Sequence, residues 1–73
     1  MILERSKKKA VALLASLPAS QPDAEMSIAN VDDHEVWLGM GWLVGNGWAV
    51  YRGDCCFRLS KVGRAEAPEF LLD

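Results

Sequence analysis

The sequence predicts one small α+β domain with an N-terminal helix, a second helix and a two-stranded antiparallel hairpin. Residues 3–17 place apolar side chains at helical spacing, residues 34–44 do so between an aspartate pair and a Gly-Asn-Gly stop, and residues 48–59 alternate in character around a Gly-Asp pair. With 73 residues, 51% of them hydrophobic and 25% charged, the chain has the length and composition of a single globular domain. We assign residues 1–67 to this domain and residues 68–73 to a short flexible tail.

The first predicted helix spans residues 3–17. Four apolar residues fall on one stripe of it: Leu3, Ala10, Leu14 and Leu17. This spacing is typical of a helix with one buried face. Pro18 ends the helix, because proline lacks a backbone N–H and disfavours the helical conformation in the residue before it. The later residues 26–31 fit either a brief strand or a single helical turn.

The second predicted helix spans residues 34–44 and has a clear start and stop. Asp32 and Asp33 offer N-cap oxygens, and their negative charge suits the positive end of the helix dipole. The segment Gly45-Asn46-Gly47 tolerates the left-handed conformation that closes helices. The helix is therefore bounded by its own neighbouring residues.

The face of this second helix that we expect to be buried repeats at spacings of three and four. It consists of Val36, Met40, Leu43 and Val44. Trp37 and Trp42 flank that face. Gly39 and Gly41 each cost about 1 kcal/mol of helix propensity relative to alanine. Their presence indicates that another backbone packs close against this helix.

Residues 48–52 and 55–59 predict a β-hairpin with a two-residue turn at Gly53-Asp54. We expect Val50, Phe57 and Leu59 to face the core. We expect the solvent side to hold Tyr51, Arg52 and Arg58. Ser60 then caps a final helical turn that ends at Gly63 or Ala67.

The charge is unevenly distributed, although the formal net charge is only -2 and the pI is near 5.2. Residues 1–17 and 37–64 are net basic, whereas residues 18–36 and the C-terminal residues are net acidic. The overall balance argues against a strong nonspecific nucleic-acid binder, because such binding depends on basic side chains that displace counterions from phosphates. A mixed pattern of this kind favours a partner with a complementary mixed surface.

No catalytic or metal-binding constellation is evident, so we predict a non-enzymatic protein without cofactor or metal. His34 has no nucleophile or second base in a recognisable motif. Residues 32–35 (DDHE) point in different directions around one turn and converge poorly on one ion. Cys55 and Cys56 are adjacent, so a mutual disulfide would be strained, and we expect reduced thiols on alternate faces of a strand. No apolar run reaches the roughly 18 residues of a membrane span, and we expect a cytoplasmic protein.

The order of elements resembles that of winged helix-turn-helix domains. Residues 38–50 (LGMGWLVGNGWAV) look like a recognition helix that runs into the first wing strand. Residues 57–64 (FRLSKVGR) are similar to the "aromatic, X, Leu, Ser or Thr, two residues, Gly, Arg" ending of many bacterial winged-helix regulators. The middle helix of that family is reduced here to residues 27–31 or is missing. Acidic residues also stand where a DNA reader has basic or amide side chains: Asp32, Asp33 and Glu35.

The small size and the acidic reading segment resemble small phage-encoded transcription regulators that bind host RNA polymerase. The resemblance implies a protein-interaction module in the host cytoplasm that inhibits initiation by occlusion or σ-factor displacement, and in some cases also suppresses termination. Aromatic and arginine side chains dominate protein-protein hot spots, so the expected protein contacts are Trp37, Trp48, Tyr51, Arg52 and Arg58. Expected contacts to phosphate or to an acidic partner are Arg5, Lys7, Lys8, Lys61 and Arg64.

Three tryptophans exceed what so small a core easily encloses, and we expect at least one to be exposed. The edge of the hairpin is also available to an extended peptide.

Two other hypotheses stay open at this point. A DNA-binding winged-helix repressor or excisionase-like factor would use its basic residues on phosphates: Lys7, Lys8, Arg52, Arg58, Lys61 and Arg64. A stabilising accessory subunit of an unrelated complex would need no such contacts. The lysine run at residues 7–9 is also explained by a charged solvent face on an amphipathic helix.

Overall fold

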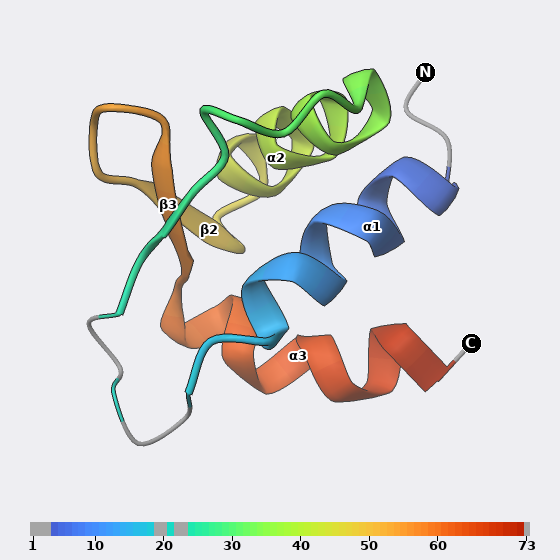
Figure 1. Cartoon of the computed structure of the whole chain (residues 1–73). Coiled ribbons are helices and arrows are strands. Elements are labelled where there is room, and N and C mark those ends of the chain that lie inside the picture. Colours follow the sequence, from blue (N-terminus) through green and yellow to red (C-terminus); the bar gives the residue numbers. More distant parts are fainter. Residues whose placement is uncertain (1–3, 19–20, 22–23, 73) are drawn as a thin grey trace.

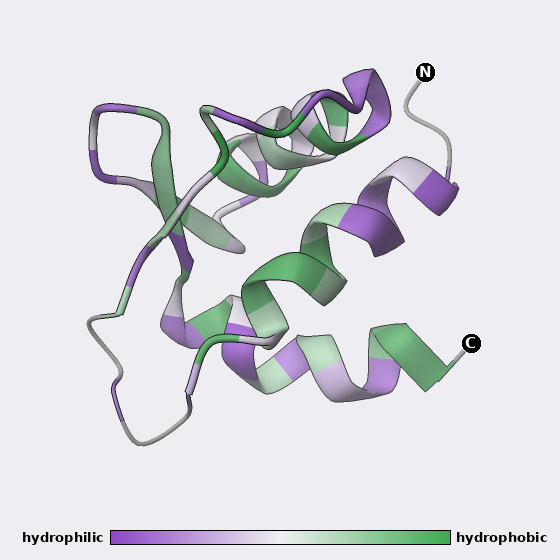
Figure 2. Ribbon diagram, in the orientation of Figure 1, coloured by the Kyte–Doolittle hydropathy of each residue, from purple (hydrophilic) through white to green (hydrophobic). Residues whose placement is uncertain are grey.

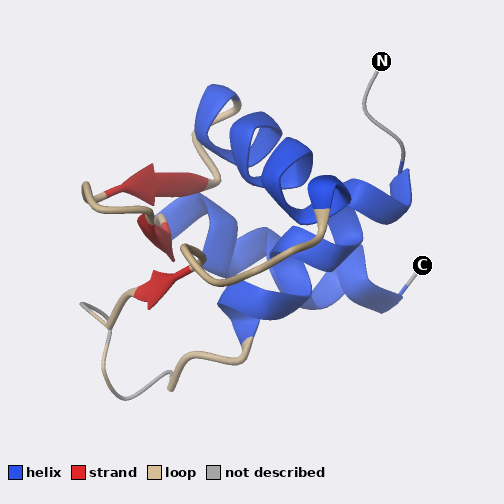
Figure 3. Ribbon diagram, turned by 45° about the horizontal axis from the view of Figure 1, so that its top comes forward, coloured by secondary structure: helices blue, strands red, loops and turns tan. Residues whose placement is uncertain are grey.

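The computed structural model describes residues 4–18, 21 and 24–72. In this part of the chain three helices lie beside a small antiparallel sheet (Figure 1; Figure 3). The elements are α1 (Glu4–Ala15), β1 (Met26–Ser27), α2 (His34–Gly45), β2 (Ala49–Tyr51), β3 (Cys56–Leu59) and α3 (Lys61–Leu72). β3 is the central strand and pairs antiparallel with both β1 and β2. The predicted α+β class is confirmed, but the described sheet has three strands where two were predicted.

Helix α1 lies between α2 and α3 and supplies the centre of the core (Figure 1). Ala10, Val11 and Leu14 are buried. Figure 2 shows the hydrophilic residues of α1 in its first half and the hydrophobic ones in its second half. The helix ends at Ala15, before the predicted end at residue 17. Leu3, predicted on the same stripe, lies outside the described residues.

The predicted ends of α2 are confirmed. The Asp33 carboxylate accepts a hydrogen bond from the Glu35 backbone N–H at 3.0 Å. At the other end the Asn46 N–H donates to the Trp42 carbonyl at 3.0 Å, and Gly47 has a φ of +77°, which glycine adopts without steric cost. Val44, predicted in the core, is 39% exposed because the buried face turns toward α1 and Val44 lies beyond its edge.

Gly39 and Gly41 of α2 differ in how closely other atoms approach them. A Cβ at Gly39 would overlap the Ser6 carbonyl oxygen and lie 2.8 Å from the Ala10 Cβ. A Cβ at Gly41 would meet no atom within 4 Å. The predicted close approach of another backbone is therefore confirmed at Gly39, where α1 packs, and wrong at Gly41.

The register of the hairpin corrects the predicted core face. Ala49 pairs with Leu59, and Val50 pairs with Arg58 on the opposite face of the sheet. Ala49 is therefore buried, and Val50 is only half-buried. A shift of one residue along a strand exchanges its two faces, so the prediction was wrong for Val50 and right for Phe57 and Leu59.

The turn of the hairpin is longer than the predicted two residues. The Arg52 N–H donates to the Cys56 carbonyl at 2.8 Å, which encloses three residues with positive φ: Gly53, Asp54 and Cys55. Cys55 therefore belongs to the turn and Cys56 to β3, so the two cysteines do not alternate on one strand as predicted. Both thiols are free, as expected.

The remaining segments agree with the prediction in part. Residues 26–31 take the first of the two predicted forms, the short strand β1 followed by a turn, with Met26 opposite Phe57, so no helix precedes α2 there. Ser60 caps α3 as predicted, because its hydroxyl accepts from the Gly63 N–H at 3.1 Å. The helix then continues through Pro68 to Leu72 and replaces the tail predicted from residue 68.

Aromatic packing explains the length of α3. Phe70 stacks on Trp42 at a centroid distance of 6.5 Å and meets Trp48 edge-on at 5.4 Å. These contacts anchor the turns that follow Pro68. No helix in the described ranges combines the length and apolar character needed to cross a membrane.

Candidate functional site

The acidic residues at the start of α2 are engaged by basic residues of α1. Lys9 Nζ donates to Asp33 Oδ2 at 3.0 Å and to Glu35 Oε1 at 2.8 Å. Arg5 Nε donates to Glu35 Oε2. No local sequence signal predicts these pairs, because the partners are separated by 24 to 30 positions.

The pKa values of these groups respond to the ion pairs. The hydrogen bonds to Glu35 and Asp33 raise the pKa of Lys9. The hydrogen bond from Lys9 lowers the pKa of Asp33, and those from Lys9 and Arg5 lower the pKa of Glu35. Solvent-exposed pairs of this kind add little stability individually. Their main consequence is that Asp33 and Glu35 do not form the unpartnered acidic surface that the sequence indicated.

The solvent side of α2 is apolar. We call this surface the α2 face, and it consists of His34, Trp37, Leu38, Gly41, Val44 and Gly45. Trp37, Leu38 and Val44 are 38%, 40% and 39% exposed. The whole helix contains neither lysine nor arginine. Exposed aliphatic and aromatic side chains on a helix without lysine or arginine match the interior of a protein-protein contact better than a nucleic-acid contact.

Trp37 is held in a fixed orientation on the α2 face. Its indole Nε1 donates to the Val31 carbonyl at 2.9 Å. Within the described part of the chain Trp37 makes no ring contact with another aromatic residue. The expectation that at least one tryptophan is exposed is confirmed by this residue.

The other predicted protein contacts lie elsewhere. Trp48 is half-buried and packs edge-on against Trp42 at 5.5 Å. Tyr51 is 54% exposed on β2 and packs against Phe57 at 5.1 Å. Arg52, in the hairpin turn, donates to Glu25 Oε2 at 3.0 Å. The structure therefore does not gather these predicted contacts on the α2 face with Trp37.

The predicted phosphate contacts differ in their surroundings. Arg5 pairs with Glu35, as described above, and Lys7 donates to Glu4 Oε1 at 3.1 Å and lies 4.5 Å from the centroid of the Trp42 ring. Three of the predicted residues form no ion pair with another described residue: Lys8, Lys61 and Arg64. The first belongs to α1 and the other two to the start of α3.

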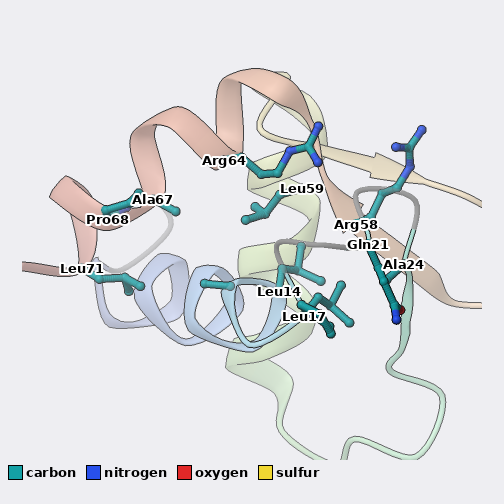
Figure 4. A pocket seen from close by; sticks show the side chains of 12 residues that line it. Leu14, Leu17, Gln21, Ala24, Arg58, Leu59, Arg64, Ala67, Pro68 and Leu71 are labelled. Carbon is teal, nitrogen blue, oxygen red and sulfur yellow. The ribbon is translucent and has the colours of Figure 1, made fainter.

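A groove between the end of α1, β3 and α3 was not predicted. Its volume is about 340 Å³, and Figure 4 shows its lining side chains. It is bordered by apolar residues of all three elements and by two arginines, Arg58 and Arg64. The sequence could not predict it, because its walls come from two segments that are more than 30 residues apart. No metal-binding group of three or more His, Cys, Asp or Glu occurs among the described residues.

Comparison with known proteins adds no family to these observations. No protein-family model matches the chain, and comparisons with curated proteins and with solved structures found no match. Support for a function therefore comes from the residues of the chain and from the resemblance that they carry.

Proposed function

We propose that this chain is a small winged-helix-like transcription regulator that acts by binding a protein, with bacterial RNA polymerase as the candidate partner. In this proposal α2 occupies the place of the recognition helix, and β2 and β3 form the wing. The observation that carries the proposal is the α2 face, which exposes apolar side chains and neither lysine nor arginine. Polymerase as the partner rests on the sequence resemblance.

The composition of α2 favours a protein over DNA as its partner. A recognition helix contacts phosphates and base edges with arginine, lysine, asparagine or glutamine side chains, and α2 has none of these residues. Burying the exposed parts of Trp37, Leu38 and Val44 against a partner would gain roughly 25 cal/mol per Å² of apolar surface. Tryptophan is also among the commonest hot-spot residues.

The α2 face is rigidly presented, which suits binding by occlusion. Gly39 brings α1 and α2 into backbone contact, and Lys9 links α1 to the first turn of α2. A surface that is already ordered loses little conformational entropy on association. Such a wedge would block a polymerase or σ-factor surface without any chemical step, and Tyr51 and Arg52 on the hairpin would supply a second contact.

Binding to purified polymerase tests this proposal. Leu38→Glu places a charge in the middle of the α2 face and should weaken binding about tenfold or more, because an unpaired charge would be buried in the contact. Val62→Glu is the matched control, since Val62 is 55% exposed on α3. Circular dichroism verifies that both variants are folded.

The expected outcome is reduced binding and reduced inhibition of in vitro initiation for Leu38→Glu alone. Wild-type protein that fails to bind polymerase, either as core enzyme or with σ-factor, would refute polymerase as the partner. Equal binding by wild type and Leu38→Glu would refute the α2 face as the contact surface.

A DNA-binding repressor is the second candidate, favoured by the three cations that form no ion pair with a described residue. Its affinity for duplex DNA should fall with salt at a log-log slope near -0.9 per phosphate contacted. We expect no measurable duplex binding at low salt. Salt-dependent binding that weakens in Lys61→Gln would support the DNA candidate instead.

A further inference from the structure

The groove beside α3 has a buried apolar floor. Leu14, Leu59 and Ala67 line it and are 1%, 6% and 3% exposed. Leu17, two residues after the end of α1, and Leu71 of α3 also line it. The buried residues of α3 are small, Gly63 and Ala67, and its large Phe70 packs on the tryptophans and does not line the groove.

The two ends of the groove differ in charge. Arg58 comes from β3 and Arg64 from α3, and Figure 4 shows both guanidinium groups at the end remote from Leu71 and Pro68. Arg64 is exposed and forms no ion pair with a described residue. The described residues that line the groove include no aspartate or glutamate. Arg64 therefore offers an exposed guanidinium at one end of the groove, whereas Leu71 and Pro68 make the other end apolar.

This polarity defines the chemistry of a matching ligand. A guanidinium binds a carboxylate through two parallel hydrogen bonds, and the leucine-lined remainder of the groove accepts an apolar chain. A volume of about 340 Å³ lies at the small end of the range of roughly 300 to 1,000 Å³ that is typical of small-molecule sites. We propose that the groove binds a small linear carboxylate, with its anionic end at Arg64 and its alkyl chain toward Leu71.

The proposed carboxylate site is separate from the proposed protein-binding surface. None of the residues that line the groove belongs to the α2 face. The two proposals can therefore fail independently, because variants in one site leave the residues of the other unchanged.

An NMR titration of the full chain with three probes tests the proposed carboxylate site. Octanoate carries both the chain and the carboxylate, 1-octanol carries only the chain, and acetate only the charge. We expect octanoate to shift the amide resonances of Leu17, Leu59 and Leu71 and to bind about tenfold more tightly than 1-octanol, as the loss of a charge-assisted hydrogen bond predicts. Acetate should leave these resonances in place. Octanoate that shifts no groove resonance, or only resonances elsewhere, would overturn the proposal.

A pair of variants on α3 separates a specific contact from general electrostatic attraction. Arg64→Gln should weaken octanoate binding about tenfold and leave 1-octanol binding unchanged. Lys61 lies about one turn before Arg64 on α3 and does not line the groove. Lys61→Gln therefore removes a nearby positive charge without changing the groove, and should leave octanoate binding unchanged. An equal loss of octanoate affinity in both variants, or no loss of affinity in Arg64→Gln, would contradict the assignment of the carboxylate to Arg64.

A capped peptide of alternating leucine and glutamate tests the competing occupant. We expect it to bind more weakly than octanoate. If the peptide shifts the groove resonances and octanoate does not, the groove is a protein-docking surface and the proposal of a small carboxylate is wrong.

Discussion

The two sides of helix α1 are packed differently. On the side of α2, Ser6 and Ala10 lie so close to Gly39 that no side chain fits between them. On the side of α3, the helix borders an open groove of about 340 Å³. One helix is thus tightly packed on one side and loosely packed on the other. The tight side also carries the ion pairs of Lys9, and the loose side carries leucines and two arginines. We therefore expect α2 to be fixed on α1, whereas the space beside α3 is open to the proposed carboxylate.

Replacing Gly39 by alanine should have the largest effect on the tight side. The added methyl group would overlap the Ser6 backbone, which cannot move without separating α1 from α2. Overpacking of this kind costs about 3 kcal/mol, which is most of the roughly 3 to 5 kcal/mol that so small a core supplies. Urea unfolding followed by tryptophan fluorescence measures the loss.

Gly41→Ala is the control, two positions along the same helix. Its methyl group would meet no atom within 4 Å, so the variant should be about 1 kcal/mol more stable than wild type through helix propensity alone. Similar changes in the free energy of unfolding for the two variants would show that α1 and α2 are not in backbone contact.

The ion pairs of the tight side should appear in the pH dependence of stability. Because the pKa values of Asp33 and Glu35 are lowered in the folded chain, their contribution is present above the unfolded-state values near 4 and is lost as the pH falls through the lower folded-state values. The raised pKa of Lys9 adds a contribution that is present below about pH 10.4 and is lost as the pH rises through the folded-state value.

In Lys9→Met the free energy of unfolding should therefore decrease less steeply than in wild type as the pH falls below about 4. Urea titrations at a series of pH values measure this dependence. Lys8→Met is the matched control, because Lys8 forms no ion pair with a described residue. Identical acid profiles for all three proteins would contradict a role of Lys9 in holding the start of α2.

Enlarging a residue on the loose side should have the smallest effect on stability. Ala15 is exposed and lines the groove, so Ala15→Leu should change the free energy of unfolding by no more than about 0.5 kcal/mol. The same variant should weaken octanoate binding, because the larger side chain occupies part of the groove. A loss of stability as large as that of Gly39→Ala would mean that the two sides of α1 are packed alike.

The parts of the fold that the sequence predicted well are those specified by near neighbours. Asp33 caps α2 through a residue two positions away, Asn46 closes the helix through Trp42, and Ser60 caps α3 through Gly63. Each contact spans four residues or fewer, so its signal is contained in a short stretch of sequence.

The candidate sites were predicted only in part. Trp37 was expected to contact a partner and is exposed on the α2 face, but Leu38 was not singled out and Val44 was expected in the core. Which residues of an apolar helix stay exposed depends on the helix packed against it, and α1 begins 30 positions before α2. Arg58 and Arg64 were predicted as contacts, but the groove that joins them was not.

The sequence by itself determined where α2 begins and ends and which segments form the hairpin, because caps and turns depend on residues a few positions apart. Only the tertiary structure decided that Ala49 rather than Val50 faces the core, that α3 passes Pro68 to pack Phe70 on the tryptophans, and that Lys9 pairs with the acids of α2. The physical reason is that burial, register and ion pairing are set by contacts between distant segments, which form only when the chain folds.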